Sequence, residues 1–341
     1  MAWLSIDLGP TFGRHLWFEG GLVVGGVDPR RPPHLLTMGT LAFKPGSLSA
    51  NVSPLEERIF SLQSPGVDCY LWTMESTLKA EQLQEKAPAQ TLRTSSKNGL
   101  PPLGPLRVLS IIIPTFNERA TIEEILRRVI AAKIPLEKEL VIVDDCSRDG
   151  TREVLLELEQ TIRQSNAAQV KLVFHKKNQG KGAAVRTGIH QASGELVLIQ
   201  DADLEYDPND YCRLLEPILS GEADVVFGNR FHGGPHRVLY FWHFQANQFF
   251  TLLADILADL NLSDMEVGYK VFRRDIFDHI RLRSNRFGFE PEVTVKVAKL
   301  RCRIYEVPIS YHGRTYEEGK KIGWKDGVAV FYHLFRARFF D

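Results

Sequence analysis

Residues 108–118 read VLSIIIPTFNE, residues 139–145 read ELVIVDD, and residues 195–205 read ELVLIQDADLE. Each stretch holds an apolar run of strand length, rich in β-branched residues, and closes on polar or acidic residues. Apolar runs without polar alternation are typical of strands that are buried on both faces. The three stretches therefore predict the central strands of a sheet, with polar side chains gathered at one edge.

Segments in which apolar residues recur at helical spacing lie between and after these strands. The expected helices are 121–132, 150–162, 180–192 and 209–219, and two further strands are expected at 170–175 and 223–229. Alternating strands and helices indicate an α/β fold with a mostly parallel sheet and helices on both faces. Ligands of such sheets bind beyond the carboxyl ends of the strands, so we expect the functional residues at that edge.

The overall composition is that of a soluble globular protein. Hydrophobic residues make up 44% of the chain, charged residues make up 25%, and the formal net charge at pH 7 is zero. No overall field therefore attracts nucleic acid, which we do not expect as a partner. The cysteines, Cys69, Cys146, Cys212 and Cys302, form no CxxC pair, which argues against a zinc site or a disulfide framework and favours a reducing cytosol.

The first part of the chain has a different texture. Residues 1–81 show little sustained periodicity and fit a small β-rich module as well as a poorly ordered extension, so we assign them no function. Residues 82–105 are rich in Pro, Ser and Gly and predict a linker, which leaves 106–341 as the main domain. Neither a secretory signal peptide nor a membrane-spanning segment is expected from the sequence.

The segment Asp201-Ala202-Asp203-Leu204-Glu205 directly follows a predicted strand. Carboxylates at alternate positions of an extended segment can converge on one hard divalent cation, which prefers oxygen ligands. Mg²⁺ or Mn²⁺ held by Asp201, Asp203 and Glu205 would neutralise charge on a diphosphate. A solvated turn is the alternative, and Asp207 does precede Pro208 as a helix cap would.

The edges after the first two strands suit a nucleotide. The candidate residues there are Pro114, Asn117, Glu118, Asp144 and Asp145. An Asp carboxylate accepts hydrogen bonds and could bind the N–H groups of uracil or guanine, although these acids could equally build turns. Lys181 lies in NQGKG, a glycine-rich turn that opens a helix and could approach an anion. Neither a dinucleotide fingerprint nor a P-loop is present.

The motifs IIIPTFNE, VIVDDCSRDGT, NQGKGAAVRTG, DADLEYDP, GNRF and EVPISYHGRTYEEGKKIGWKDG occur in one order. In that order and spacing they resemble the family 2 glycosyltransferases of the GT-A fold, over about residues 108–338. Dolichyl-phosphate mannose synthases and bacterial polyprenyl-phosphate transferases are the branch that the chain resembles most. The resemblance implies an inverting enzyme that moves a hexose from a GDP- or UDP-linked donor to polyprenyl or dolichyl phosphate.

The resemblance also assigns residues. It implies that Asp201, Asp203 and Glu205 bind the metal and that Arg230 and Arg314 bind phosphates, with Lys320 and Lys321 as weaker candidates. Asp264 lies where the family keeps an acid near the sugar. Because a phosphate monoester is already largely ionised at neutral pH, a strong general base is unnecessary, and we expect Asp264 to orient or act as a weak base.

Two segments rich in aromatic residues, 236–260 and 324–340, are interrupted by polar residues and predict amphipathic helices. Core packing is their usual fate, but a lipid acceptor would require a surface that meets the membrane. Phe241, Trp242 and Phe244 are the candidates for insertion. The expected location is therefore peripheral, on the cytoplasmic face of a membrane.

Other functions remain open from the sequence. A soluble family 2 transferase acting on a sugar hydroxyl would need a general base, and Asp264 would then be essential. A non-catalytic nucleotide-sugar-binding protein would tolerate loss of the metal ligands, but this chain keeps its full acidic set.

Overall fold

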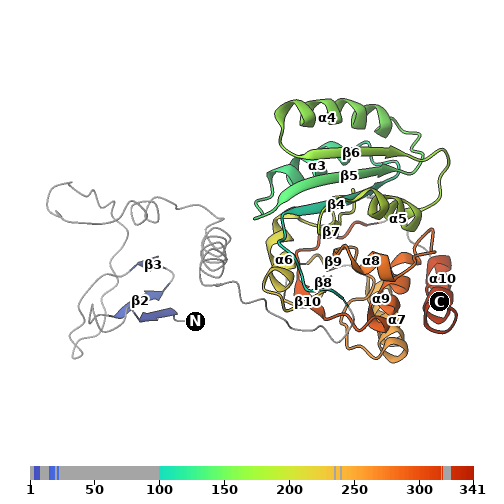
Figure 1. The fold of residues 1–341 in the computed structure, drawn as a ribbon. Helices are drawn as coiled ribbons and strands as arrows, with labels where there is room; N and C mark the ends of the chain where they lie inside the picture. Colours follow the sequence, from blue (N-terminus) through green and yellow to red (C-terminus); the bar gives the residue numbers. More distant parts are fainter. Residues whose placement is uncertain are drawn as a thin grey trace, which may run out of the picture. The chain divides into compact units, whose positions relative to one another are not determined.

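A computed structural model describes residues 100–233, 236–238, 240–315, 317 and 324–341, together with the backbone of strands β1–β3 near the N-terminus. The main domain contains a seven-stranded sheet with the order β10-β8-β9-β7-β4-β5-β6 (Figure 1). Its strands are β4 (Val108–Thr115), β5 (Glu137–Asp144), β6 (Gln169–Phe174), β7 (Leu196–Ile199), β8 (Val225–Asn229), β9 (Lys270–Arg273) and β10 (Ile304–Pro308).

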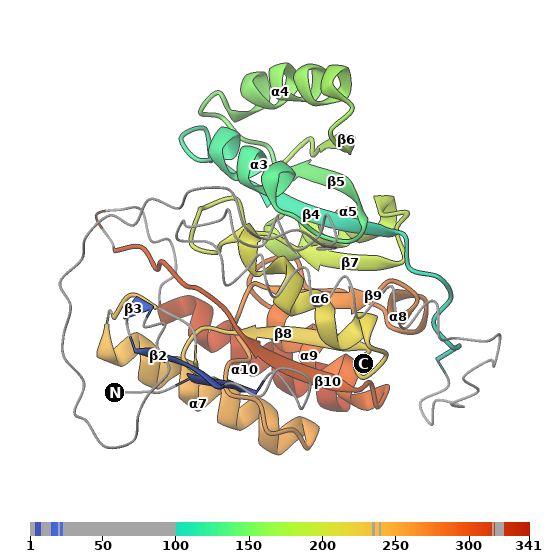
Figure 2. The same cartoon turned by 90° about the vertical axis from the view of Figure 1, so that its left-hand side faces the viewer.

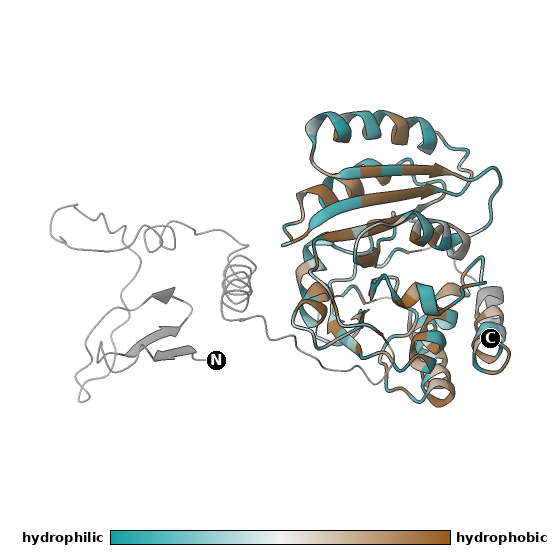
Figure 3. Ribbon diagram, viewed as in Figure 1, coloured by the Kyte–Doolittle hydropathy of each residue, from teal (hydrophilic) through white to brown (hydrophobic). Residues whose placement is uncertain are grey.

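The sheet is mostly parallel, as the sequence predicts. β4 pairs in parallel with β5 and β7, β5 with β6, and β8 with β10, whereas β9 runs antiparallel to both β7 and β8. The apolar runs of β4, β5 and β7 are almost completely buried, and the strands are predominantly hydrophobic in Figure 3. The predicted α/β class is therefore confirmed, and five of its strands lie where the sequence places them.

Helices cover the sheet on both faces. They are α3 (Ile122–Ala131), α4 (Thr151–Ser165), α5 (Lys181–Gln191), α6 (Tyr211–Leu219) with a preceding 3₁₀ turn (Pro208–Asp210), α7 (Phe241–Ala258), α8 (Ile276–His279), α9 (Phe289–Lys299) and α10 (Trp324–Phe339). α3 packs against α4, whereas α5 packs on β4 and β5 from the other side, as Figure 2 shows. The four helices predicted up to residue 219 are all present.

Helices α7, α9 and α10 pack against one another and form a second, smaller core. Met265, which precedes β9, is fully buried among Ala254 of α7, Val295 of α9 and Leu334 of α10. The first amphipathic helix begins at Phe241, five residues later than the predicted start at His236, because His236 forms a β-bridge with Tyr311. The second, α10, spans nearly the whole predicted range.

The N-terminal region contains a three-stranded antiparallel sheet, β1 (Leu4–Asp7), β2 (His15–Glu19) and β3 (Gly21–Leu22). Most of the predicted linker, up to residue 99, lies outside the described residues. Its last part differs from the prediction: Leu100 is buried in the core of the main domain, and Arg273 Nη2 donates to Pro101 O at 2.6 Å.

No described helix is long and apolar enough to span a membrane. The described cysteines, Cys146, Cys212 and Cys302, form no disulfide with one another, whereas Cys69 lies outside the described residues.

A glycine lets α5 approach the sheet closely. A Cβ atom built on Gly188 would lie 2.4 Å from Ile112 Cγ2 on β4. We expect Gly188→Val to lower the free energy of unfolding by about 1–3 kcal/mol through overpacking. Urea titration followed by circular dichroism measures this loss.

Gly104→Val is the matched control, because a Cβ at Gly104 meets no atom within 4 Å. Its stability should stay within about 0.5 kcal/mol of the unsubstituted protein. Equal stability of both variants would show that α5 does not pack on β4 at this distance.

Candidate active site

Arg314 binds two of the predicted metal ligands after β7. Its Nη2 donates to Asp203 Oδ2 at 2.7 Å, and its Nε donates to Glu205 Oε1 at 3.0 Å. Tyr311 extends the same contact, since its hydroxyl donates to Glu205 Oε2 at 3.2 Å. These contacts attach residues 311–314, far along the chain, to the acidic loop, which is the segment 201–205 that follows β7.

The carboxylates of the acidic loop act on one another electrostatically. Burial, together with the charges of Asp201 and Glu205, raises the pKa of Asp203 to about 7, although Arg314 acts in the opposite direction. Oxygen ligands that repel one another suit a hard divalent cation, which would favour the ionised form of Asp203. The donor set therefore fits Mg²⁺ or Mn²⁺ chemically.

The three predicted ligands do not converge on a single point. Within the described ranges, no group of three or more acidic, His or Cys side chains is arranged to hold one metal ion. Asp201 instead pairs with Lys181 Nζ at 2.8 Å, while Asp203 and Glu205 share Arg314. The metal site accordingly stays a prediction.

Lys181 bridges two acids. Besides Asp201, its Nζ lies 3.0 Å from Glu290 Oε1 at the start of α9. Burial alone would lower the pKa of Lys181, but the charges of Asp201 and Glu290 raise it well above its usual value. Lys181 is therefore charged and compensates the acids next to the sheet edge.

The glycine-rich turn that carries Lys181 packs against protein. A Cβ on Gly182 would lie 2.6 Å from Ser284 O, and the N–H of Gly182 donates to Arg286 O at 3.2 Å. The N–H of Gly180 donates to Asp145 at 2.6 Å. These glycines thus allow close packing. Because their N–H groups already bind Asp145 and Arg286 O, the turn does not offer them to the anion of a ligand.

Asp144 and Asp145 are buried and have partners within the protein. Asp144 Oδ2 lies 2.5 Å from Arg152 Nε and accepts from the backbone N–H of Ser147. Asp145 accepts from the backbone of the NQGKG turn, and its Oδ1 lies 2.7 Å from His175 Nδ1. The structure shows that both acids build loops, which was the alternative reading of their positions. Their binding to a nucleotide base stays a prediction.

The residues after β4 lie beside a shallow cavity of about 420 Å³, lined by Asn117, Glu118, Arg119, Ala120 and Asp149. Asn117 has a positive φ of 53° and is held there because its Oδ1 accepts from Arg148 N at 2.9 Å. Burial lowers the pKa of Arg314, whereas the charges of Asp203, Glu205 and, least of these, Glu118 raise it, so Glu118 is within electrostatic reach of Arg314. Pro114 lies half-buried in β4 directly before these residues.

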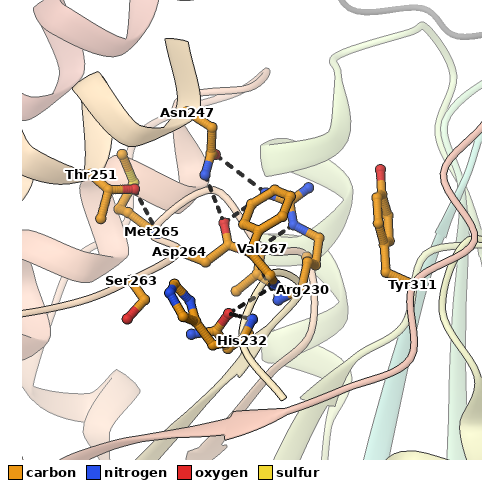
Figure 4. A network of polar contacts seen from close by, with 12 residues as sticks. Arg230, His232, Asn247, Thr251, Ser263, Asp264, Met265, Val267 and Tyr311 are labelled. Atoms are coloured by element: carbon orange, nitrogen blue, oxygen red, sulfur yellow. Dashed lines mark hydrogen bonds and ion pairs between the residues drawn. The ribbon is translucent and has the colours of Figure 1, made fainter. Parts of the chain in front are cut away.

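Arg230, at the end of β8, forms a bidentate ion pair with Asp264 (Figure 4). Both nitrogen–oxygen distances are 2.7 Å, and Asp264 is fully buried. Asn247 of α7 completes the group, since its Oδ1 accepts from Arg230 Nη2 and its Nδ2 donates to Asp264 Oδ1. The centroid of the Tyr311 ring lies 5.2 Å from Cζ of Arg230. Because the hydroxyl of Tyr311 binds Glu205, this residue links the Arg230–Asp264 pair to the acidic loop.

Both oxygens of Asp264 are therefore occupied by Arg230, which agrees with an orienting function better than with a base. The remaining donors of the guanidinium are those of Nη1, for which no protein acceptor is found among the described residues. Lys320 and Lys321 lie outside the described residues.

The sequence reasoning did not single out Tyr311, Asn247 or Glu290. Tyr311 lies inside the motif EVPISYHGRT, and Asn247 is an amide within an otherwise apolar helix, which is a signal for a buried polar contact. No pattern marked Glu290.

The sequence profile of glycosyl transferase family 2 matches residues 110–281. The dolichol-phosphate mannosyltransferase of Pyrococcus furiosus is 29% identical over 67% of this chain and 63% of its own length. The undecaprenyl-phosphate 4-deoxy-4-formamido-L-arabinose transferase of Pseudomonas aeruginosa is 30% identical over 63% of this chain and 61% of its own length. The chain thus spans less than two thirds of these curated relatives.

Among solved structures, glucosyl-3-phosphoglycerate synthase of Mycobacterium tuberculosis shares the fold. It superposes with a TM-score of 0.51 and 21% sequence identity over 69% of this chain and 82% of that one. The same enzyme in complex with Mn²⁺, uridine diphosphate and phosphoglyceric acid gives a TM-score of 0.50 at 21% identity, over 69% of this chain and 80% of that one. The predicted GT-A fold class is thereby confirmed, and the profile match shows that the chain belongs to glycosyl transferase family 2.

Proposed function

We propose that this protein is an inverting glycosyltransferase that moves a hexose from a nucleotide-sugar to a polyprenyl phosphate with the help of a divalent cation. The observation that carries the proposal is the pair of cation–carboxylate groups at the sheet edge, Arg314 with Asp203 and Glu205, and Arg230 with Asp264. The names of the two curated relatives, both transferases to polyprenyl-type phosphates, support this acceptor.

The acidic loop would receive the donor's diphosphate. Asp201, Asp203 and Glu205 would hold Mg²⁺ or Mn²⁺, which as a Lewis acid neutralises charge that develops on the leaving nucleoside diphosphate. Arg314 and Lys181 compensate part of the charge of these acids. The cavity beside Asn117 and its neighbours gives room for the nucleotide base, of guanine or uracil type.

The acceptor phosphate would bind at Arg230. The two N–H groups of Arg230 Nη1 are available to phosphate oxygens, while Asp264 and Asn247 hold the guanidinium plane. Because the phosphate is already largely dianionic, it attacks the anomeric carbon without losing a proton to the enzyme. In-line attack inverts the configuration at that carbon.

A transferase acting on a sugar hydroxyl is the competing function, because such an acceptor must lose a proton to a base. Nucleotide-sugar binding without catalysis is the other. One assay separates the three: purified enzyme is incubated with Mn²⁺, GDP-mannose or UDP-glucose, and polyprenyl phosphate, unphosphorylated polyprenol or an oligosaccharide. A glycosylated oligosaccharide would indicate the hydroxyl acceptor, and no product with any acceptor would indicate binding without catalysis. Mass spectrometry should find a glycosyl polyprenyl phosphate, and no product from the unphosphorylated alcohol.

Asp203→Ala should abolish transfer while the fold survives. Loss of this carboxylate leaves diphosphate charge uncompensated, which costs several kcal/mol of activation energy, on the order of 10³-fold in rate. Initial rates with saturating donor and Mn²⁺ measure the effect. Asp207→Ala is the matched control, because Asp207 caps the neighbouring 3₁₀ turn and should affect stability but not rate. Full activity of Asp203→Ala, or of the unsubstituted enzyme in excess EDTA, contradicts the metal.

Arg230 and Asp264 should behave as one unit. Asp264→Asn should slow transfer far less than the roughly 10⁴-fold upper end of general-base effects, because the acceptor is already ionised. The double variant Arg230→Gln/Asp264→Asn should be no slower than Arg230→Gln alone, since groups that act together are not additive. Steady-state rates of the three variants test this. A full 10⁴-fold loss in Asp264→Asn, or additive losses, would favour a base and a hydroxyl acceptor.

We further propose that α7 and α10 meet the membrane. Trp242, Phe249 and Ile256 are spaced by seven residues along α7 and are 80%, 52% and 71% exposed. Phe249 also contacts Phe331 of α10, with ring centroids 5.6 Å apart, which joins the two amphipathic helices in one apolar surface. A shallow groove of about 450 Å³ continues this surface, lined by Phe331, Tyr332, Phe335, Arg336 and Phe340.

The residues expected to insert differ in their exposure. Phe244 is only 38% exposed, because its ring packs on Phe231 with centroids 5.1 Å apart, whereas Phe241 and Trp242 are well exposed. A polyprenyl tail stays in the bilayer, so an exposed apolar surface on the helix that also holds Arg230 suits this acceptor. The location on the cytoplasmic face stays a prediction.

Replacing Trp242, Phe249 and Ile256 with Gln should weaken binding to vesicles of phosphatidylcholine and anionic lipid by more than tenfold. Each buried large side chain is worth at most about 1.5–3 kcal/mol at an interface. Donor binding should not change. Leu156→Gln with Leu219→Gln, which alters exposed apolar residues elsewhere, is the control. If the triple variant co-sediments with vesicles as the unsubstituted protein does, another surface meets the lipid.

A further inference from the structure

The loop between α7 and β9, residues 263–268, is held by contacts on almost every residue. The backbone N–H groups of Ser263 and Asp264 donate to Glu306, and that of Met265 donates to Thr251 Oγ1 at 3.1 Å. The N–H of Gly268 donates to the hydroxyl of Tyr206 at 2.9 Å.

The side chain of Lys270 also binds this loop. Its Nζ donates to Met265 O at 2.9 Å and to Val267 O, and its side chain is fully buried. A loop attached at so many points has one conformation, so each of its side chains has a defined direction.

Glu266 is the exception within this loop, because its carboxyl oxygen Oε1 is buried without a hydrogen-bond partner. Glu290 of α9 is 4% exposed and likewise has one buried oxygen, Oε2, without a partner, while its other oxygen binds Lys181. The described part of the chain contains one more such oxygen, Oδ1 of Asp341. This atom lies 2.6 Å from Arg283 Nη1 and so has an ionic partner. Buried polar atoms are almost always paired, so these two carboxyls call for an explanation.

The charge of Glu290 acts on the carboxyl group of Glu266. The pKa of Glu266 is raised to about 8, chiefly because the group is buried and secondly because of the charge of Glu290. The other charged groups that act on it are Lys270, Arg230 and Asp264. A carboxyl group in this setting can both donate and accept a hydrogen bond near neutral pH.

Neighbouring residues connect Glu266 and Glu290 to both ionic groups of the site. Asp264, two residues before Glu266, binds Arg230, and Gly268, two residues after it, abuts Asp201: a Cβ there would lie 2.2 Å from Asp201 Oδ2. On the other side, Glu290 reaches Asp201 through Lys181. Glu266 therefore lies in the chain between a residue that binds Arg230 and a residue that contacts Asp201, and Lys181 joins Glu290 to Asp201.

We propose that Glu266, together with Glu290, binds hydroxyl groups of the donor's sugar and so determines which hexose is accepted. The inference rests on the proposed function, in which the sugar lies between the diphosphate at Asp201 and Asp203 and the acceptor phosphate at Arg230. Sugar hydroxyls are the groups that would satisfy both orphaned oxygens there, because each hydroxyl can donate to a carboxyl oxygen and also accept a hydrogen bond. Glu266 is accordingly a specificity-determining residue and takes no part in bond making.

The test compares two ligands of the whole chain in the presence of Mn²⁺: the intact nucleotide-sugar, and the nucleoside diphosphate that lacks the sugar. Titration calorimetry measures the Kd for GDP-mannose and GDP, or for UDP-glucose and UDP. Glu266→Ala should weaken binding of the nucleotide-sugar by about 10- to 100-fold, as expected when a buried hydroxyl group loses its hydrogen-bond partner. The Kd for the nucleoside diphosphate should change less than about twofold. Glu266→Gln, which keeps an acceptor oxygen, should recover part of the loss.

Donors that lack single hydroxyl groups identify the contact. A deoxy donor that the unsubstituted enzyme binds weakly should lose nothing further in Glu266→Ala, because the partner is already absent. Glu139→Gln is the control. It alters a buried carboxylate near the amino-terminal end of β5, which binds Ser110, Ser193 and Lys171. Its ratio of the two Kd values should equal that of the unsubstituted protein.

The outcomes separate the two claims. If the unsubstituted enzyme binds and transfers the sugar but Glu266→Ala keeps the ratio of Kd values, the carboxyls only share a proton and the inference is wrong. If the unsubstituted enzyme binds no nucleotide-sugar, the proposed function is wrong and this inference with it. Should Glu266→Ala fail to fold, Glu266→Met with the deoxy donors decides, since Met keeps the length of the side chain without the carboxyl oxygens, and an unchanged deoxy penalty in that variant overturns the contact.

Discussion

Arg314 holds Asp203 and Glu205 together at the carboxyl edge of the sheet, and the rest of the site depends on this compensation of charge. Burial and the charges of Asp201 and Glu205 raise the pKa of Asp203, whereas the charge of Arg314 opposes this shift. Lys181 compensates the charge of Asp201. A loop arranged in this way is suited to ligands that bring positive charge of their own, such as a divalent cation on a diphosphate.

The second half of the site is attached to a helix. Arg230 and Asp264 are held by Asn247 on the inner side of α7, while Trp242, Phe249 and Ile256 occupy its exposed side. A single helix therefore connects the proposed phosphate-binding arginine with the proposed membrane surface. This arrangement suits an enzyme whose donor is dissolved in water and whose acceptor remains in a bilayer, because one rigid element can place the lipid phosphate beside the donor.

The parts of the fold predicted from the sequence are those with long, uniform patterns. β4, β5 and β7 are apolar runs bounded by polar motifs, and no other element fits such a run. β9 was missed because its four residues, KVFR, begin and end with basic side chains, and the burial of Lys270 depends on carbonyls of the preceding loop. β10, only five residues long, lies at the edge of the sheet, where its side chains are only partly buried.

The candidate site was predicted as a list of residues but not as a set of pairs. The sequence identified Asp203, Arg230, Asp264 and Arg314, whereas the pairing of each acid with its arginine depends on chain segments that are far apart. Asp145 and the glycine-rich turn show the limit most clearly: both matched ligand-binding patterns, but the carboxylate accepts hydrogen bonds from the turn itself. Local sequence cannot distinguish a loop that binds a ligand from a loop that binds another loop.

The central claim is that the acidic loop after β7 binds a metal–diphosphate complex. Electron paramagnetic resonance of Mn²⁺ tests it most directly, because bound Mn²⁺ loses the sharp signal of the free ion. In the presence of a nucleoside diphosphate we expect one protein-dependent Mn²⁺ site per chain, lost in Asp203→Ala and retained in Asp207→Ala. A free-ion signal that is the same with and without the unsubstituted protein would contradict the account.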